Sequence, residues 1–469
     1  MTTRSVPHVS HPPSPSPFGV NNVSRFIAFR VFFNCRFYYP VFTVLFLDFG
    51  ISVAQFAILN AVWAATIVLA EVPSGVLADV VGRKRLLVFA AFSMVVEMLI
   101  LCLAPRDHLS LLFGFFVVNR ILSGLAEAAA SGVDEAIAYD ALQEQGMADQ
   151  WGRVLDRTMR LQSIMFILTM MVGAAVYDAD LMSRVAALAG WEAGITPEQT
   201  LRLPIYLTLV LAVLCVMAVL GLDEIRPPGA HESEHTESHQ ASPQTFSTRH
   251  TMGAAVRLTL ATGRWILKTP FVLVVILYGM LFDGILRMTV TLASQYYRMI
   301  QLPESSFGLM GSAMSVAGIF IPRLCLWMAE NRSPAFCLGS TVVTALSGLC
   351  GMAFFWPYIG LVPALIAFSA MTMTGFYVSY FVNQKTSSFQ RATVLSFKGL
   401  ACNISYGMLG IFYAGLLEVK KSQVKVHGID TQSIENMVFT ETFFWFPVAL
   451  AAGLIVVWAG VRIFRKQNK

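Results

Sequence analysis

Charged side chains stand inside several long apolar stretches of this sequence, and they are the residues best placed to do chemistry. Arg36 and Arg287 each interrupt such a stretch, and Asp283 stands four residues before Arg287. An ionisable group at the centre of a bilayer costs at least about 2.5–3.5 kcal/mol, so it needs a partner, water or a ligand. Guanidinium groups bind carboxylate and phosphate through a planar fork. We therefore predict that Arg36 and Arg287 bind an anionic group of a substrate, with Tyr39, Asn34 and Asp283 beside them.

The same two arginines also have a structural interpretation. Arg36 can pair with Asp283 or Glu71, and Arg287 can pair with another acid, in which case neither arginine is free to bind a ligand. The sequence leaves both interpretations open.

These charges are rare, and the elements that position them are apolar. Of 469 residues, 56% are hydrophobic and 13% are charged, whereas roughly a quarter of an average soluble domain is charged. A helix needs about 20 apolar residues to cross a bilayer. We predict an all-α membrane protein, because the runs lack the alternation of a barrel strand. The twelve predicted transmembrane helices lie near 29–49, 54–77, 86–104, 110–133, 160–177, 203–222, 269–297, 305–328, 335–356, 359–382, 393–417 and 442–463.

A polar segment divides these helices into six and six. We predict a disordered linker there, because its middle is too polar to be buried. The second half aligns with the first at an offset of 251, which pairs Arg36 with Arg287 and predicts two pseudo-symmetric six-helix bundles. The predicted divisions are a disordered cytoplasmic N-terminus (1–24), an N-terminal bundle (25–222), a cytoplasmic linker (223–268), a C-terminal bundle (269–464) and a cytoplasmic tail (465–469).

The loops carry the signal for orientation, since Lys and Arg accumulate on the cytoplasmic side of membrane proteins. Arg83, Lys84 and Arg85 follow the second helix, and Arg153 and Arg157 follow the fourth. We therefore expect a multi-pass protein of the cell membrane, the inner membrane of a bacterium, with both termini cytoplasmic. The net charge of +5 reflects this topology and predicts no nucleic-acid partner.

The loop after the second predicted helix has a recognisable pattern. It reads Gly75-Val-Leu-Ala-Asp79-Val-Val-Gly82-Arg83-Lys84-Arg85. We expect Gly75 to permit close packing and Gly82 to make the turn. The pattern resembles the signature loop of the major facilitator superfamily, with Val80 where that family usually has Arg. The resemblance implies a cytoplasmic gate formed by Gly75, Asp79, Gly82, Arg83 and Lys84, in which Asp79 helps to latch the two bundles together.

The fourth predicted helix carries a second pattern. Arg120, Gly124, Glu127, Ser131 and Asp134 are spaced by three or four residues and share one helical face. Arg120-x-x-x-Gly124 resembles the second signature of the superfamily, whose Arg is associated with proton transfer. The resemblance implies coupling residues at Arg120, Glu127 and Asp134, with Glu71 of the second helix as a further carboxylate. Arg36 and Arg287 are placed similarly to the phosphate-binding pair of the organophosphate to phosphate antiporters.

Taken with the resemblance, these features predict a secondary active transporter that works by alternating access. We expect a monomer in the lipid bilayer that moves a small organic or phosphate-bearing anion, with protons or another ion as the coupling partner. A proton-coupled multidrug efflux antiporter is an alternative, although 160–177 lacks the Gly-Pro pair usual there. A non-transporting sensor or scaffold is another. No phosphate-binding loop or catalytic constellation occurs, so we predict no enzyme activity, no cofactor and no metal, even at His231, His235 and His239.

Overall fold

The computed structural model describes residues 16–191, 194–224, 257, 263–385, 388–424 and 430–467, and this part is helical without a strand. Eleven of its helices are long and apolar enough to cross a membrane. The remaining crossing consists of two shorter helices, α1 (Asn21–Asn34) and α2 (Phe42–Phe49). The prediction of an all-α membrane protein with twelve transmembrane helices is confirmed. Residues 1–15 and most of the predicted linker, with its three histidines, lie outside the described residues.

The N-terminal bundle contains the first six crossings. The fourth crossing bends between α5 and α6 at Gly132, whose φ is +73°. Two short helices, α8 (Ala179–Leu188) and α9 (Pro197–Thr200), lie between the fifth and sixth crossings. After α1 and α2, the crossings are α3 (Val53–Val81), α4 (Arg83–Leu103), α5 with α6 (Leu109–Ala130 and Val133–Glu144), α7 (Trp151–Tyr177) and α10 (Leu203–Leu220).

The C-terminal bundle repeats this plan. Its first crossing is also divided, into α12 (Pro270–Thr291) and α13 (Ala293–Met299). Thr43 and Ser294, which stand 251 positions apart, are the second residues of α2 and α13, and Thr43 N donates to Ser294 Oγ at 2.9 Å. The other crossings are α14 (Phe307–Asn331), α15 (Pro334–Met352), α16 (Leu361–Lys385), α17 (Ser388–Gln423) and α18 with α19 (Thr431–Phe443 and Trp445–Gln467).

The first crossing is interrupted where one continuous helix was predicted. The chain leaves the helix at Cys35 and resumes it at Phe42. Pro40 lies in the break and cannot donate a backbone hydrogen bond. Other elements satisfy the freed groups, since Phe37 N donates to Thr208 Oγ1 at 3.0 Å. A Cβ on Gly173 of α7 would lie 1.7 Å from Phe37 O, so only glycine lets α7 approach the break this closely.

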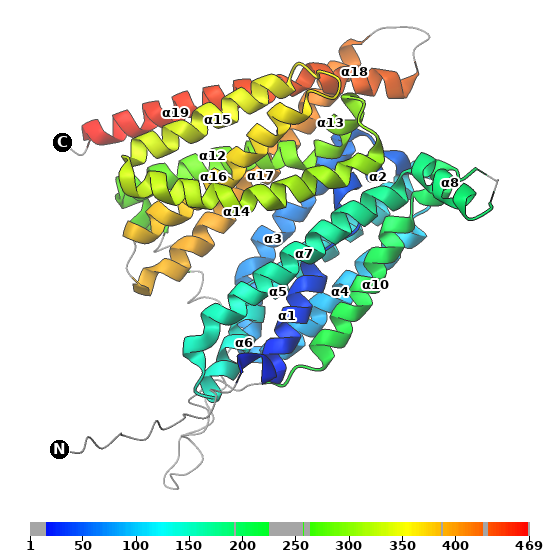
Figure 1. Cartoon of the computed structure of the whole chain (residues 1–469). Coiled ribbons are helices and arrows are strands. Elements are labelled where there is room, and N and C mark those ends of the chain that lie inside the picture. Colours follow the sequence, from blue (N-terminus) through cyan, green and yellow to red (C-terminus); the bar gives the residue numbers. More distant parts are fainter. Residues whose placement is uncertain are drawn as a thin grey trace, which may run out of the picture.

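The two bundles meet at one end and separate at the other (Figure 1). They meet where α2 and α13 end, and they diverge toward α6 and the far end of α14. We call the first end the Asp48 face, after the residue near the end of α2, and the other the Gly82 face, after the turn between α3 and α4.

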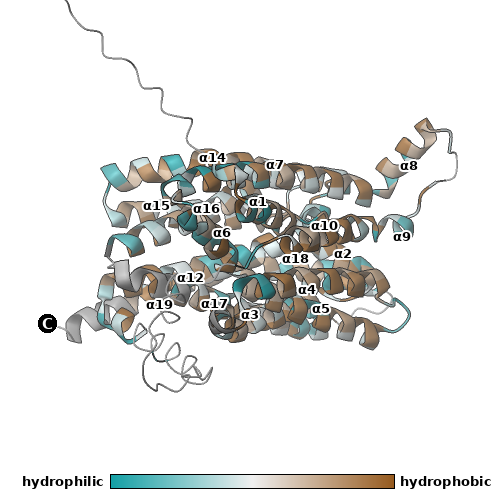
Figure 2. Cartoon of the chain, turned by 90° about the horizontal axis from the view of Figure 1, so that it is seen from below, coloured by the Kyte–Doolittle hydropathy of each residue, from teal (hydrophilic) through white to brown (hydrophobic). Residues whose placement is uncertain are grey.

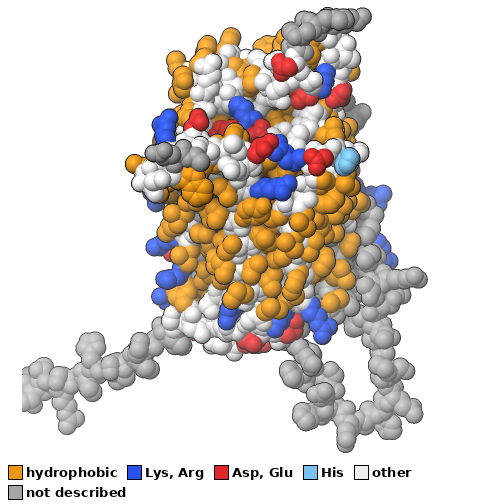
Figure 3. Space-filling view, turned by 90° about the vertical axis from the view of Figure 1, so that its right-hand side faces the viewer, with side chains coloured by type: hydrophobic (Ala, Val, Ile, Leu, Met, Phe, Trp, Pro, Cys, Tyr) orange, Lys and Arg blue, Asp and Glu red, His pale blue; other side chains and the backbone are white. Residues whose placement is uncertain are grey.

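The outward surfaces are hydrophobic, as a protein surrounded by lipid requires. Brown, hydrophobic ribbon predominates on the outer helices in Figure 2. The space-filling view in Figure 3 shows a broad hydrophobic surface with charged side chains gathered above and below it.

Candidate functional site

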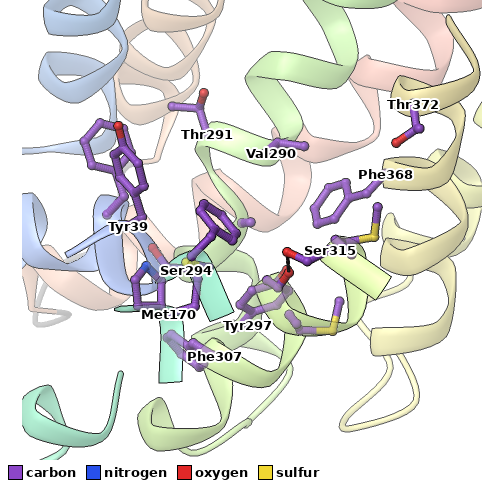
Figure 4. A pocket seen from close by; sticks show the side chains of 17 residues that line it. Tyr39, Met170, Val290, Thr291, Ser294, Tyr297, Phe307, Ser315, Phe368 and Thr372 are labelled. Carbon is purple, nitrogen blue, oxygen red and sulfur yellow. Dashed lines mark hydrogen bonds between the residues drawn. The ribbon is translucent and has the colours of Figure 1, made fainter. Parts of the chain in front are cut away.

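A cavity of about 320 Å³ lies between the bundles, and both contribute to its walls. Figure 4 shows Tyr39 and Met170 from the N-terminal bundle opposite Thr291, Tyr297 and other residues of the C-terminal bundle. The described residues that line the cavity are apolar, aromatic or hydroxyl-bearing, and none of them is charged. They are Tyr39, Pro40, Phe42, Phe166, Met170, Val290, Thr291, Ala293, Ser294, Tyr297, Phe307, Met310, Gly311, Met314, Ser315, Phe368 and Thr372.

A second, wider cavity continues from the first toward the Gly82 face. It has a volume of about 830 Å³ and lies along α14 and α16, where its lining includes Pro322, Tyr380 and Asn383. Thr372 lines both cavities. Its lining reaches Gln384, next to the last residue of α16, so this second cavity lies toward the Gly82 face.

The Asp48 face is closed by a polar network that joins the bundles. Arg298 Nη1 and Nη2 each donate to one oxygen of Asp48 at 2.7 Å. Arg298 also pairs with Glu304 at 2.5 Å, and the Tyr177 hydroxyl donates to Asp48 Oδ2 at 2.5 Å. Two carboxylates surround the guanidinium of Arg298, a group that stays protonated in proteins. Arg298 is therefore a permanent cation in this network.

Asp178, directly after α7, adds a second connection. Its Oδ1 accepts from Leu181 N and its Oδ2 from Ser305 N, both at 2.9 Å. Burial raises the pKa of this carboxyl, but the hydrogen bonds from Leu181 and Ser305 outweigh burial and leave the pKa below its usual value. We call Asp48, Tyr177, Asp178, Arg298, Glu304 and Ser305 the latch. Within the described residues, the hydrogen bonds and ion pairs that join the bundles are those of the latch and of Thr43 with Thr291 and Ser294, with Val44 N also donating to Ser294.

Glycines hold the bundles in close contact below the latch. A Cβ on Gly308 of α14 would lie 2.2 Å from Met170 O of α7, and one on Gly311 would lie 2.0 Å from Met170 Cε. On the other side, a Cβ on Gly410 of α17 would lie 3.1 Å from Ala57 O of α3. These contacts are of the small-residue kind that lets membrane helices approach closely.

Arg36 is buried inside the N-terminal bundle. Its Nη1 donates to Glu97 Oε1 at 2.7 Å and to the Tyr38 hydroxyl at 2.9 Å, and the two charged side chains are 4% and 0% exposed. The carboxylate partner comes from α4 and is neither Asp283 nor Glu71. The predicted role of Arg36 in substrate binding stays a prediction, and its charge is already neutralised.

Arg287 lies nearer the cavity. Its Nη2 is 2.5 Å from Asp283 Oδ2, its Nη1 donates to Asn403 at 2.8 Å, and its guanidinium stands 5.3 Å from the Tyr406 ring. The Tyr406 hydroxyl is 3.0 Å from Thr291 Oγ1, which lines the cavity. Arg287 is 26% exposed. The structure therefore brings Arg287 and Asp283 together, and it gives Arg36 and Arg287 separate partners among the described residues.

Arg120 differs from both because it has no acidic partner among the described residues. It is 4% exposed and lies 5.0 Å from the rings of both Phe42 and Phe46. Its Nε and Nη2 are buried without a hydrogen bond. A buried cation without a counter-charge is costly, so Arg120 is the best-supported candidate for binding a charged ligand. Phe42 separates it from the cavity, which Phe42 also lines.

Glu127 stands two turns farther along the same helix. Its side chain is exposed and lies near Tyr39 of the cavity wall.

The remaining predicted coupling residues occupy other places. Asp134 is 1% exposed and pairs with Arg30 of α1. Glu71 Oε2 is buried without a hydrogen bond, and a Cβ on Gly399 of α17 would lie 3.9 Å from Glu71 Oε1, which places Glu71 between the bundles. Asn34 Nδ2 donates to Arg30 O of its own helix.

The predicted gate loop is held within the N-terminal bundle. Gly82 has a φ of +107°, as the expected turn requires. Arg83 pairs with Asp140 of α6, and Lys84 N donates to Glu224 at 3.4 Å. Asp79 belongs to α3, and its side chain lies outside what the structure describes. The gate role of these residues stays a prediction.

Close packing occurs at a different glycine from the one expected. Gly75 is exposed and has open space where a Cβ would stand, so this structure shows no close contact there and the packing role of Gly75 stays a prediction. A Cβ on Gly124 of α5 would lie 2.8 Å from Thr66 Cβ and 3.0 Å from Trp63 O of α3. Gly124 is therefore the residue that allows two helices of this bundle to approach.

Sequence reasoning missed the latch. Asp48 and Arg298 are the next-to-last residues of α2 and α13, which end the first crossings of the two halves, and their charges are opposite. They stand 250 positions apart, one short of the offset. That combination was a usable signal. Tyr177 and Asp178 gave none, because a single polar residue after a transmembrane helix is common.

Comparisons with known proteins agree with this architecture. A family model described as Major Facilitator Superfamily matches residues 26–411. The fold is similar to a point mutant of the nucleoside transporter NupG, with a TM-score of 0.66, 13% identity and coverage of 94% of this chain and 100% of that one. It is also similar to a bacterial homologue of the human lysosomal transporter Spinster in an inward-facing, unoccupied conformation (TM-score 0.64, 13% identity, 97% and 99% coverage). A third similar structure is the xylose transporter XylE from E. coli, partially occluded and inward open (TM-score 0.55, 13% identity, 95% and 99% coverage). Curated proteins gave no match.

Proposed function

Because this chain belongs to the major facilitator superfamily, we propose that it is a secondary active transporter that carries a small organic anion by alternating access. The family establishes a multi-pass membrane transporter and not an enzyme. The direction, the coupling and the substrate class are our proposal. The observation that carries it is the buried, unpaired Arg120 behind the wall of a cavity that both bundles line.

The loop charges support an orientation. Arg83, Lys84 and Arg85 begin α4 at the Gly82 face, and Arg153 and Arg157 lie in the first turns of α7. This excess of Lys and Arg supports a cytoplasmic location of this face. The protein then spans the cell membrane with its cytoplasmic side open and the Asp48 face closed.

The distribution of contacts supports alternating access. The polar cross-bundle contacts of the described residues are at or near the Asp48 face, while Arg83 and Lys84 at the Gly82 face bind partners in their own bundle. Each bundle consists of six crossings that are consecutive in the sequence, so it can move as a unit. Both cavity walls come from one chain, which is why a monomer suffices.

The lining supports an organic substrate. Aromatic rings and methionines form most of the cavity, and hydroxyls such as those of Tyr39, Ser294 and Thr372 supply a few polar contacts. Sites of this composition bind apolar bodies and fix them with few hydrogen bonds. The substrate we propose has an apolar or aromatic body and one charged group.

The balance of charges indicates the sign and size of that group. Arg36 is matched by Glu97 and Arg287 by Asp283. Arg120 and Glu71 keep buried atoms without a hydrogen bond, and Glu127 is exposed without an ion pair among the described residues. When both Glu71 and Glu127 bind a proton, one positive charge at Arg120 is uncompensated, and an anion is then favoured because unpaired charge is costly at membrane depth. This arrangement suits a singly charged group such as a carboxylate better than a phosphate dianion, and it suits proton-coupled transport.

Ligand-induced stabilisation of the purified protein tests this proposal. In lipid nanodiscs, thermal unfolding is measured with panels of monocarboxylates, phosphate esters, neutral solutes and organic cations. A compound at 100 times its Kd stabilises the protein by about 2.7 kcal/mol. We expect stabilisation by monocarboxylates with apolar bodies, which is lost in Arg120→Gln and kept in Arg160→Gln, an exposed arginine on α7 paired only with Asp156.

Transport in proteoliposomes then separates binding from coupling. We expect uptake of the stabilising compound to depend on a proton gradient, and Glu127→Gln to retain exchange of substrate for substrate while losing that dependence. Stabilisation by organic cations alone, unaffected by Arg120→Gln, would favour the efflux antiporter. Absence of both binding and exchange would favour the sensor or scaffold.

A further inference from the structure

The short helix α8 has an apolar face whose outer residues, Val185 and Leu188, are exposed. Leu181, Val185 and Leu188 are spaced by four and three residues and therefore share one side of the helix. Val185 is 51% exposed and Leu188 is 90% exposed. None of the ten residues of α8 is buried. Trp191, just beyond the helix, is 67% exposed.

The polar side of α8 is already in use. Ser183 Oγ accepts from Ile195 N at 2.8 Å and donates to Ile195 O at 3.3 Å, so the returning loop lies against this side. Asp178 accepts from Leu181 N and, with its other oxygen, from Ser305 N of the C-terminal bundle. The start of α8 is thus fixed on the molecule, and its apolar face is the one left open.

The position of α8 identifies what covers that face. The membrane-spanning part of α7 ends at Tyr177, and α8 begins at Ala179, so α8 lies at the depth where the chain leaves the membrane. Figures 1 and 2 both show α8 extending past the end of α7 and away from the other helices. The exposed apolar side chains of α7, including Leu168 and Met171, lead up to it. The surface of α8 therefore continues the lipid-facing surface of the bundle.

We propose that α8 and Trp191 form an amphipathic anchor that lies in the lipid headgroup layer at the Asp48 face, with Leu181, Val185 and Leu188 against the acyl chains. Amphipathic helices with an apolar stripe and a charged opposite side bind at this depth. Tryptophan is enriched at the same level of membrane proteins. Arg184 stands four residues before Leu188 and so borders the apolar face, where its long side chain reaches the headgroup layer. The exposed Asp180, three residues before Ser183, lies toward the polar side.

Spin labels on neighbouring positions of α8 test the proposal. Leu188→Cys places a label on the apolar face. Ala187→Cys places a matched label at the preceding residue, which is also exposed but points away from that face. Both are made where Cys102 and Cys350, the free cysteines that are not buried, are replaced by serine. The protein is placed in nanodiscs of phosphatidylcholine and phosphatidylglycerol, and collision of each label with oxygen and with a water-soluble nickel chelate is measured.

We expect the label at Leu188 to lose collisions with nickel and gain collisions with oxygen relative to the label at Ala187, and we expect this contrast to vanish in detergent-free amphipol without lipid. Equal nickel accessibility at both positions would overturn the proposal by placing α8 in water. Protection at Leu188 accompanied by dipolar broadening between labels would overturn it in favour of a second copy of the chain. Elution of both variants as the unmodified protein does on gel filtration verifies their folding.

Discussion

Asp48 and Arg298 face each other as a two-pronged ion pair, with both guanidinium nitrogens 2.7 Å from carboxylate oxygens, and each ends the first crossing of its own bundle. Their side chains are 35% and 29% exposed. The pair therefore lies at the boundary between protein and water, where it closes one end of the cavity without being sealed from solvent.

We predict that Asp48→Asn opens the Asp48 face. Loss of a charged, two-pronged contact at this exposure costs about 1–3 kcal/mol, which shifts the equilibrium between closed and open by roughly 5–150-fold. Spin labels at Leu109 and Ile359, both exposed near this face, report the change as a longer distance in pulsed electron paramagnetic resonance. Arg160→Gln serves as the control, and the exchange Asp48→Arg with Arg298→Asp restores the shorter distance. An unchanged distance in Asp48→Asn contradicts the latch.

We predict that Arg36→Gln lowers stability. Removal of one partner from a buried ion pair leaves the other charge uncompensated and costs about 3–5 kcal/mol, and Glu97 is 0% exposed. Thermal unfolding followed by tryptophan fluorescence measures this loss, and the double variant Arg36→Gln with Glu97→Gln recovers part of it. Arg287→Gln lowers stability less, because the pair of Arg287 with Asp283 is partly exposed. If Arg36→Gln instead unfolds at the temperature of the unmodified protein and loses only ligand binding, Arg36 binds the substrate as the sequence predicted.

We predict that Gly308→Ala disfavours closure of the Asp48 face. The new methyl group lies 2.2 Å from Met170 O, a backbone atom that cannot move alone. The control is Gly318→Ala in the same helix, where a Cβ meets open space. Alanine favours a helix over glycine by about 1 kcal/mol, so Gly318→Ala is neutral or slightly stabilising. The Leu109 to Ile359 distance is the readout, and equal behaviour of the two variants contradicts the close contact of α7 with α14.

We predict that strong acid on the Asp48 side loosens the latch. The pKa of Asp178 is lower in the folded protein than in an unfolded chain. Its contribution to the stability of the closed latch is therefore fully present above the ordinary carboxyl pKa of about 3.9. It is lost as pH falls through the lower folded pKa. Glu304, Asp48 and Arg298 face the same region. The label distance at decreasing pH measures the effect, and Asp178→Asn, which keeps an accepting oxygen without titrating, reduces it. A pH response of the same size in Asp178→Asn assigns the change to other carboxylates.

The architecture was predictable because hydropathy and length dominate it. Twelve apolar runs and one polar divider are enough to predict two bundles. Thr43 and Ser294, which are in contact in the structure, stand at the same offset of 251 that the sequence indicated. Periodicity failed at Cys35–Val41, where an apolar sequence hides a break that Thr208 and Gly173 of other helices stabilise. The helix boundaries also moved, as at α7, which begins at Trp151 in a polar stretch outside the predicted run.

The site was predicted less well, because the sequence lists the buried charges without their partners. The sequence offered Asp283 and Glu71 as partners for Arg36, and only the packing of the helices selects Glu97. Arg120 was placed correctly on the face with Gly124, yet its isolation between Phe42 and Phe46 depends on the second half of a broken helix. The roles assigned to Glu127, Glu71 and Asp79 stay predictions.

The tight fit of Gly173 against Phe37 has a consequence for motion. Met170, one turn earlier on α7, touches Gly308 of the opposite bundle. A single helix is therefore interlocked with its own bundle on one side and abuts the other bundle across an interface that must slide. Any tilt of α7 carries the broken segment with it, so the wall from Tyr39 to Phe42 travels with the helix and the cavity changes shape whenever the two halves reorient.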